Sequence, residues 1–495
     1  MRGLLAAGLS MMMAVCFAAD IPLQIAVSSR VPCSGDVIRL AACPTAAASA
    51  PISGDVIFSV EQEGRERPVG KTRVAPDPNR PFEPSVEWRA GLPGLYRVIV
   101  RQTEAGQPVA RLLLPVVAQP VFFGWYGPTR PEVEWMTHHL TASAAEIEAL
   151  HARGVVALKR ADGVSYFGGT RWEHIPPGLD MGALAPRILK DYTDTRPWDG
   201  IAIDELGMWD QHPEQTALAL EFGKILKQAR LDRPDQFVAV WQFGSLTPLE
   251  CNLFRDSADV ILCEVYENYF RAWNDLHSFE DYLTQRVQVA RSMQVIKKTI
   301  LGLSISSDFG DVTPEELEEQ VRRVRMQGPE MRGLAFFTTG RCSDAVLKRA
   351  NECCFRYFVR PVVGFFSEGD LTLSDHQPVD QGTVRLQATV HNVGGMDARQ
   401  VRVRFWDGDP AKGGEPIGGP QFITRLPAAR WVDPDGLNTR SKEPAETLRR
   451  EGFGIVTVSV PWKAKRGPHQ LWAEIVPDSQ YTTLRGFQEL RVTVR

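Results

Sequence analysis

The spacing of apolar residues changes twice along the chain and divides it into three regions. From about residue 21 to 117, apolar and polar residues alternate in short runs such as DVIFSVEQEG and GLYRVIVRQT, separated by Gly, Pro and Asn. A period of two places one face of each run in a core and the other in water, which is typical of a β-sandwich. The same alternation returns from about residue 362 to 495, for example in QVRVRFWDGD and FGIVTVSVPWKA.

Between these two regions, short and fully apolar runs alternate with helical stretches, as a parallel sheet covered by helices requires. We predict strands at residues 121–127, 155–160, 200–204, 237–243, 259–265, 299–306 and 333–339. Five intervening stretches have apolar residues three and four apart and predict helices: AAEIEALHARG, PEQTALALEFGKILKQARL, SFEDYLTQRVQVARSMQ, TPEELEEQVRRVRMQG and SDAVLKRANECCFRYF. The last three begin with a Ser or Thr cap.

The gap between residues 161 and 197 is longer than one connection needs. An eighth strand near GVSYFGG and a helix at MGALAPRILKDY would complete a (β/α)8 barrel of about 240 residues. In that fold, residues 200–204 form the fourth strand and 259–265 the sixth. A doubly wound open sheet is the alternative, but the first strand lacks the glycine-rich turn that binds dinucleotides in such sheets.

Composition and the N-terminal residues indicate an exported globular protein. Apolar residues make up 43% of the chain and charged residues 23%, and the net charge of −4 offers no basic field for nucleic acid. The start, MRGLLAAGLSMMMAVCFAAD, combines one early Arg, a short apolar stretch and small residues, which is typical of a secretory signal cleaved after Ala18. No later segment is long and apolar enough to predict an integral membrane span. We therefore expect a secreted or periplasmic protein.

We predict a multidomain α/β plus all-β protein: a signal peptide at residues 1–18, a β-sandwich at 20–118, a TIM-type catalytic barrel at 120–360 and a second sandwich at 362–495. GLPGLYRVIV resembles the late strand of immunoglobulin-like domains. The stretch DLTLSDHQPVDQGTVRLQATVHNVGGMDARQVRVRFWDGD resembles a CARDB domain, a β-sandwich of bacterial surface and secreted proteins. That resemblance implies attachment to a cell surface or polysaccharide. We expect residues 410–451 to form a long excursion or loop.

The stretch WDGIAIDELGMWD, residues 198–210, places two acids side by side after an apolar strand. Strand alternation turns Ile201 and Ile203 toward the helices, and Asp204 into the barrel, while Glu205 begins the loop at the rim. An inward carboxylate loses water and needs compensation. One interpretation is structural, with Asp204 paired to a base such as Lys159. The other is catalytic, because glycosidic bond cleavage needs two carboxyl groups around one cleft.

The pattern Asp199-Gly200-x-x-x-Asp204 resembles the strand-four signature of family 18 chitinases and α-amylase-type glycoside hydrolases. The chain departs from both, because the catalytic Glu of the chitinase pattern falls at Leu206 and the Arg of the amylase pattern at Ala202. Barrel enzymes of the α-galactosidase type carry acids on strands four and six, which corresponds here to Asp204 and Glu264. The resemblance implies a glycosidase in which Asp204 is the nucleophile or stabiliser and Glu264 the general acid. Glu205 is the substitute for either role.

Sugar rings stack on aromatic faces, and several rings follow the predicted strands. We expect the substrate to contact a set of residues at the barrel mouth: Trp125, Tyr126, Lys159, Trp209, Trp241, Tyr266 and Asp308. His138 and His139 are adjacent and should diverge, which favours a surface or capping role over a metal site. No metal or cofactor is expected. The alternative function is a non-catalytic carbohydrate-binding or adhesive surface protein with a degenerate barrel.

Overall fold

A computed structural model describes residues 23–44, 54–74, 84–102, 108–130, 133–162, 180–206, 213–272, 278–428 and 454–495. The predicted signal peptide therefore lies outside the described residues. The chain folds into two compact units. The first unit contains Met1–Ala26, Arg39–Trp88 and Arg97–Leu113, and the second contains Val27–Ile38, Arg89–Tyr96 and Leu114–Arg495. Among the described helices, none combines the length and the apolar composition that a bilayer crossing needs.

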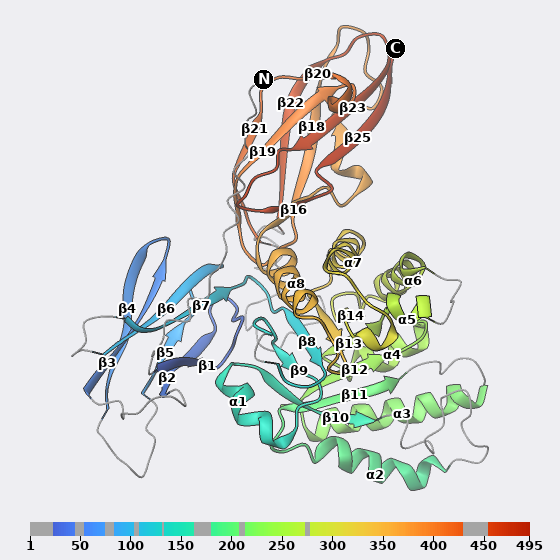
Figure 1. Ribbon diagram of the computed structural model, residues 1–495. Helices are drawn as coiled ribbons and strands as arrows, with labels where there is room; N and C mark the ends of the chain where they lie inside the picture. Colours follow the sequence, from blue (N-terminus) through green and yellow to red (C-terminus); the bar gives the residue numbers. More distant parts are fainter. Residues whose placement is uncertain are drawn as a thin grey trace. The chain divides into compact units, whose positions relative to one another are not determined.

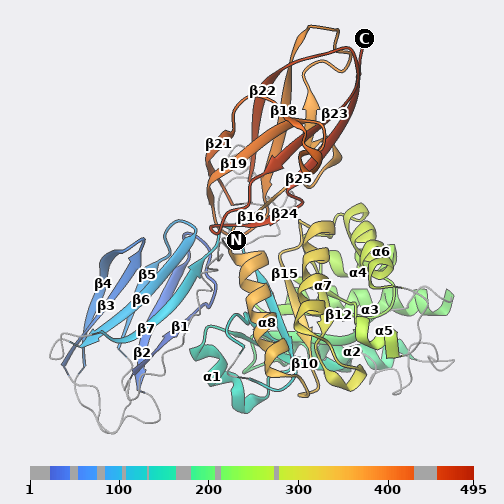
Figure 2. The ribbon, with the colours of Figure 1, turned by 45° about the horizontal axis from the view of Figure 1, so that its top comes forward.

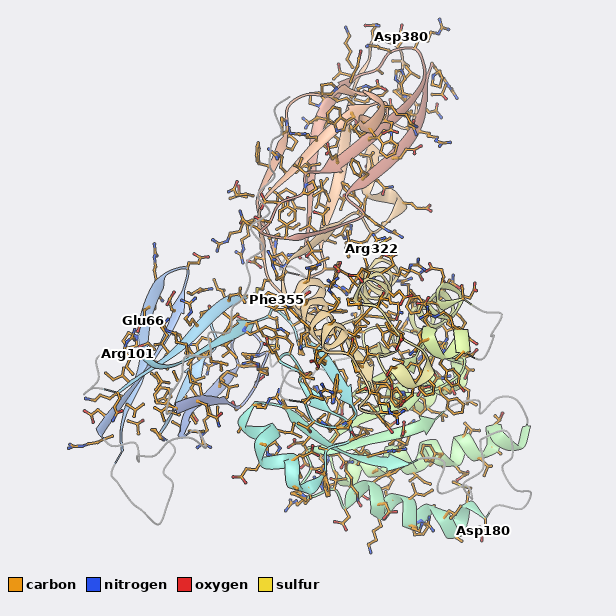
Figure 3. The ribbon with its side chains drawn as sticks, in the orientation of Figure 1. Glu66, Arg101, Asp180, Arg322, Phe355 and Asp380 are labelled. Atoms are coloured by element: carbon orange, nitrogen blue, oxygen red, sulfur yellow. The ribbon has the colours of Figure 1, made fainter. Side chains whose placement is uncertain are left out.

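The N-terminal strands form two sheets, as the alternating pattern predicted. One sheet contains β1 (Leu23–Val27), β2 (Val37–Pro44) and β5 (Ser85–Arg89); the other has the order β4 (Arg65–Val74), β3 (Gly54–Gln62), β6 (Gly94–Gln102) and β7 (Pro108–Val116). The Tyr96 hydroxyl donates to the Leu92 carbonyl at 2.9 Å, the tyrosine-corner contact of immunoglobulin-like sandwiches. On the four-stranded sheet, Glu66 and Arg101 form an ion pair (Figure 3).

The central region is a closed barrel of eight parallel strands (Figure 1). In chain order the strands are β8 (Phe122–Tyr126), β9 (His138–His139), β10 (Val156–Asp162), β11 (Gly200–Leu206), β12 (Phe237–Gln242), β13 (Val260–Glu264), β14 (Thr299–Ser304) and β15 (Gly333–Phe337). Strand β15 pairs with β8 and β9 pairs with β10, so the barrel has no free edge. The predicted (β/α)8 architecture is confirmed.

The second strand of the barrel was predicted in the wrong place. It is β9, the two histidines, whereas GVSYFGG lies outside the described residues. His139 is fully buried and not at the surface, and it is held by Thr129 and by the Thr141 amide. His138 packs between Phe122 and Phe237, with ring centroids 4.3 and 4.5 Å apart. Both imidazoles therefore have a structural role in the barrel, His138 through packing and His139 through hydrogen bonds.

Helices lie outside the strands (Figure 2). They are α1 (Ile147–Ala152), α2 (Met181–Thr193), α3 (Pro213–Asp232), α4 (Pro248–Arg255), α5 (Glu267–Ala272), α6 (Phe279–Ser292), α7 (Pro314–Gln327) and α8 (Asp344–Cys354). The predicted Ser and Thr caps are confirmed at Ser278, Thr313 and Ser343. Helices α4 and α5 were not predicted, because each is short. One π-turn, Phe355–Val359, extends α8, and Phe355 stacks on Trp135 at 5.0 Å (Figure 3).

The C-terminal region is a sandwich of two five-stranded sheets. The first contains β16 (Val362–Gly364), β17 (Leu371–Leu373), β18 (Thr383–Asn392), β22 (Ile455–Lys463) and β24 (Thr482–Leu484). The second contains β19 (Ala398–Asp407), β20 (Glu415–Pro416), β21 (Gln421–Leu426), β23 (Gly467–Ile475) and β25 (Phe487–Val494). Within the predicted excursion at 410–451, residues 415–426 instead add β20 and β21 to β19. Residues 429–453 lie outside the described part of the chain.

Asn392, in the stretch that resembles a CARDB domain, is a buried hydrogen-bonding centre. The Asn392 side chain is fully buried; its carbonyl accepts from the Val362 and Gly394 amides, and its amide donates to the Met396 and Leu426 carbonyls. A buried amide group with every hydrogen bond satisfied fixes the local backbone. The residue therefore joins β18 to β16 of the same sheet and to β21 of the other sheet.

Candidate active site

One row of side chains projects into the barrel at the carboxyl ends of its strands. The apolar interior contains Leu158, Ala202, Ala239, Leu262 and Ala335. Because strand residues alternate between two faces, the side chains two positions further along also point inward. That alternation gives the row Arg160, Asp204, Trp241, Glu264 and Phe337, to which β8 adds Tyr126 and β14 adds Ser304. The structure thus brings the two predicted acids, Asp204 and Glu264, to one end of the barrel.

Asp204 lies at the centre of a polar triad. Its side chain is 8% exposed, and Oδ2 accepts a 2.8 Å hydrogen bond from the Tyr126 hydroxyl and a 2.8 Å contact from Arg160 Nη2. The Arg160 guanidinium also lies 5.5 Å from the centre of the Tyr126 ring. A cation and a hydroxyl donor both stabilise the charged form of a buried carboxylate. Because the Arg160 side chain is 46% exposed, the ion pair lies at the open end of the barrel.

The charges of Glu264 and Asp204 both affect the ionisation of the Tyr266 hydroxyl. Tyr266 follows β13 directly, is buried, and stacks on Phe337 with ring centroids 5.2 Å apart. Its pKa is raised well above the ordinary value, first by burial and then by the charges of Glu264 and Asp204. Both carboxyl groups therefore lie within electrostatic reach of the Tyr266 hydroxyl.

Trp241 fills the space between the two acids. Its strand, β12, lies between β11 and β13, and its ring is 1% exposed. A Cβ on Gly302 would lie 2.8 Å from the indole, so glycine is needed there for the ring to cross the barrel. The indole N–H lies near the Tyr266 hydroxyl and partly lowers its pKa, yet the two groups do not reach hydrogen-bond geometry.

The Asp-Gly step of the sequence signature has a structural role. The Asp199 carboxylate accepts from the Ala157 amide at 2.7 Å and contacts His151 at 2.9 Å, which fixes the start of β10 beside β11. A Cβ on Gly200 would lie 1.9 Å from the Phe237 carbonyl, so only glycine allows that strand approach. Asp199 and Gly200 thus position Asp204 from the opposite end of its strand.

A β-bulge lies at the second acid of the pair. Ile203 pairs with Val240 but Leu206 pairs with Gln242, so Asp204 and Glu205 together face one residue of β12. Strand β11 therefore continues through Leu206, and Glu205 does not begin the loop as predicted. The side chain of Glu205 lies outside the described part of the structure. Bulges are frequent beside active sites, where they redirect a side chain.

An aromatic wall extends from the row toward the barrel rim. The ring centroid of Phe337 lies 5.2 Å from that of Tyr126 and 6.1 Å from that of Phe309. The Phe309 and Tyr269 ring centroids are 5.2 Å apart. Asp308, predicted to bind substrate, lies beside this wall and accepts hydrogen bonds from Thr339 and Arg341. The hydrogen bond from Thr339, followed by the charge of Arg341, lowers the Asp308 pKa. The carboxylate therefore stays ionised at the rim.

Two predicted substrate contacts are wrong because their side chains face the other way. Trp125 is 1% exposed and donates to the Pro128 carbonyl at 2.9 Å, in the layer between β8 and α8. Lys159 donates to the Asp194 carbonyl at 3.3 Å and lies 5.8 Å from the Trp198 ring. Alternation along β10 gives the inward position to Arg160 instead. Trp209 lies outside the described residues.

Sequence reasoning missed Arg160, Ser304, Phe309 and Phe337. Arg160 could have been found, because it is two residues after Leu158 in the strand VVALKR, and residues two apart on a strand point to the same face. Among the described residues, no three His, Cys, Asp or Glu side chains gather closely enough to hold a metal ion. The groups present, two acids with a hydroxyl, an indole and a guanidinium, can exchange a proton and stabilise a developing positive charge.

No family model and no curated protein matches the sequence. Among solved structures, the chain is similar to an endo-β-N-acetylglucosaminidase of Cordyceps militaris, at 14% identity over 47% of this chain and 89% of that one, with a TM-score of 0.35. A β-glucuronidase of Bacteroides uniformis matches at 10% identity over 96% of this chain and 62% of that one, with a TM-score of 0.32. A CARDB domain of Pyrococcus furiosus matches at 12% identity over 28% and 91%, with a TM-score of 0.19. The strand pairing of the chain itself defines a closed eight-stranded barrel followed by a sandwich of two five-stranded sheets.

Proposed function

We propose that the protein is an exported glycoside hydrolase that cleaves O-glycosidic bonds in a poly- or oligosaccharide. One observation carries the proposal: Asp204 on β11 and Glu264 on β13 take inward positions at the carboxyl end of the barrel, where β12 alone separates their strands. Active sites of (β/α)8 barrels lie at that end. Glycosidases use two such carboxyl groups around one bond.

The contacts of Asp204 suit one of the two roles. Asp204, which accepts from Arg160 and Tyr126, attacks the anomeric carbon or stabilises the positive charge that forms there. Glu264 takes the other role and donates its proton to the leaving oxygen as the glycosidic bond breaks. Water then supplies a hydroxyl group to the anomeric carbon, and its proton returns to a carboxylate. Glu205 is the candidate to replace either acid.

A polysaccharide digestion screen with purified protein tests the proposal. Wild-type protein should release reducing ends from at least one glycan, and Asp204→Asn and Glu264→Gln should abolish that release while keeping the wild-type melting temperature. Glu148→Gln, an exposed carboxyl on α1, is the matched control and should remain active. Release that persists in both active-site variants would eliminate this assignment of the acids.

A second candidate function is glycan binding without catalysis. The position of the chitinase acid is Leu206, and Asp204 is already engaged by Arg160, which suits a barrel that binds sugar but does not cleave it. A glycan array separates the two functions. A purely binding protein should retain a glycan on the array without releasing fragments from it, in the wild type and in Asp204→Asn alike.

We further propose export and surface attachment. Residues 1–18 have the composition of a cleaved signal, and mass spectrometry of the protein from the native cell should find an N-terminus near Ala19. In the C-terminal sandwich, Trp406 and Trp472 face each other across β19 and β23 on the outward side, and Phe487 of β25 lies 6.4 Å from Trp472. These rings suit contact with polysaccharide. Trp472→Ala should reduce sedimentation with the cell envelope, and unchanged sedimentation would argue against this surface.

A further inference from the structure

Three buried hydrogen-bonding groups beside the two acids have no partner in hydrogen-bond geometry among the described residues. They are the Tyr266 hydroxyl, the Trp241 indole N–H and the Ser304 hydroxyl. All three residues are more than nine-tenths buried. Most buried polar groups in folded proteins have a hydrogen-bond partner, so three such groups on neighbouring strands need an explanation.

The three groups gather on neighbouring strands. Trp241 belongs to β12, Tyr266 follows β13, and Ser304 ends β14. In the pairing of β13 with β14, Glu264 is opposite Gly302, so the next inward positions are Tyr266 and Ser304. The absent side chain at Gly302 leaves room for the Trp241 ring beside them. The unpartnered groups therefore lie on three neighbouring strands at the carboxyl end of the barrel, beside the two acids.

The charges around these three groups select the kind of ligand. The described ionisable side chains of the inward row are Asp204, Glu264 and Arg160, and the Arg160 charge is already offset by Asp204 at 2.8 Å. Tyr266 remains a neutral hydroxyl because burial and both acids raise its pKa. The Arg286 guanidinium near Glu264 is buried on α6 and donates to the Tyr282 and Gly244 carbonyls. A ligand carboxylate placed here would lose water and face two acids whose nearby cations are already engaged. A ligand hydroxyl would supply the missing hydrogen bonds.

We infer that Tyr266, Trp241 and Ser304 form a subsite for an uncharged sugar residue, which they hold through its hydroxyl groups and which they distinguish from a uronic acid. The inference rests on the proposed function for the location of the site and adds the class of sugar. The two acids contact the same sugar residue, and the three unpartnered groups set its orientation. Tyr266 and Ser304 are positioning residues, because they contact the sugar away from the bond that breaks.

Two matched ligand pairs test the inference by isothermal titration calorimetry at pH 7: glucose against glucuronic acid, and galactose against galacturonic acid. The members of each pair differ in the group at carbon six, a neutral alcohol or a carboxylate. At least one neutral sugar should bind, and its uronic acid should bind at least about tenfold more weakly. Equal or tighter binding of the uronic acid, or no binding of any of the four, would overturn the inference.

Tyr266→Phe and Ser304→Ala provide a second readout that a purely structural role would not give. Each removes an unpartnered hydroxyl, so the melting temperature should stay the same or rise, while the affinity for the neutral sugar falls about tenfold. Tyr481→Phe, which removes a hydroxyl bonded to the Val476 carbonyl far along the chain, is the control and should bind normally. Unchanged sugar affinity in Tyr266→Phe would contradict the subsite.

These measurements separate the inference from the proposed function, since binding requires no hydrolysis. Neutral-sugar binding without cleavage of any glycan would end the hydrolase proposal and leave the subsite standing. Asp204-dependent cleavage of uronides as fast as neutral glycosides would end the subsite and leave the hydrolase standing.

Discussion

The Tyr126 hydroxyl and the Arg160 guanidinium contact the same oxygen of Asp204, each at 2.8 Å. Tyr126 ends β8 and Arg160 lies on β10, so residues from two other barrel strands fix the carboxylate of β11. A carboxylate held in one orientation before substrate arrives needs little reorganisation during reaction. This arrangement is the basis of the predictions below.

Replacing Tyr126 by Phe should weaken catalysis with little effect on folding. The variant loses the hydrogen bond to Asp204 but keeps the ring that contacts Trp241 and Phe337. A hydrogen bond to a charged group contributes about 1.5–3 kcal/mol, so kcat/KM should fall roughly tenfold to a hundredfold. Steady-state kinetics on the substrate from the digestion screen measures the effect. A wild-type kcat/KM would show that Tyr126 does not orient the acid.

Replacing Arg160 by Met should destabilise the barrel through the unpaired Asp204. Removing one partner of a fully buried ion pair costs about 3–5 kcal/mol, but the Arg160 side chain is 46% exposed, so we expect about 1–2 kcal/mol. The Arg160→Met/Asp204→Asn double variant should recover much of that loss. Urea unfolding of the two single variants and the double variant gives the coupling energy.

Lys159→Met is the matched control for that cycle. Lys159 precedes Arg160 on the same strand but faces Asp194 and Trp198, so its loss should leave both activity and the coupling to Asp204 unchanged. A coupling energy near zero between Arg160 and Asp204, or a loss of activity in Lys159→Met, would show that the parity assigned to β10 is incorrect.

Burial of His139 should make the stability of the barrel fall in mild acid. Burial lowers its pKa from 6.5 to about 4, so between these values the unfolded chain binds a proton that the folded barrel does not. The contribution of neutral His139 to the free energy of unfolding is complete above pH 6.5, and it is lost progressively as the pH falls toward 4. From pH 7 to pH 5 the barrel should lose about 2 kcal/mol from this group.

His139→Gln tests that pH dependence, because an amide can hydrogen-bond Thr129 and cannot take up the proton. Urea unfolding at pH 7 and pH 5 should show a smaller difference between the two pH values in the variant than in the wild type. The exposed His376, replaced in the same way, is the control and should leave the difference as it is. An unchanged difference in His139→Gln would exclude this source of acid sensitivity.

The apolar runs predicted seven of the eight barrel strands because buried parallel strands are apolar on both faces. The second strand, His138–His139, has no such run: only two residues pair on each side, and the core accepts their rings between Phe122 and Phe237. Such a strand follows from closure of the barrel and not from local pattern. Tertiary packing overrides local propensity in this case.

The prediction of the site depended on the parity of single residues. Asp204 follows Ala202 in a regular strand, so its inward direction could be deduced from alternation. Lys159 and Trp125 were each one position from the inward residues Arg160 and Tyr126, and a shift of one residue turns a side chain to the opposite face. The bulge at Glu205 interrupts the alternation of inward and outward residues along β11. It arises from the pairing of β11 with β12, and the sequence of β11 alone does not reveal that pairing.

The most direct test of paired action by Asp204 and Glu264 is kcat/KM for the wild type, Asp204→Asn, Glu264→Gln and the double variant on one glycoside. If the two acids cleave the bond together, each single change should reduce kcat/KM by about a thousandfold or more, and the double variant should lose little beyond the worse single variant. Single variants that retain more than about a tenth of wild-type kcat/KM, or losses that multiply as for independent sites, would contradict the account.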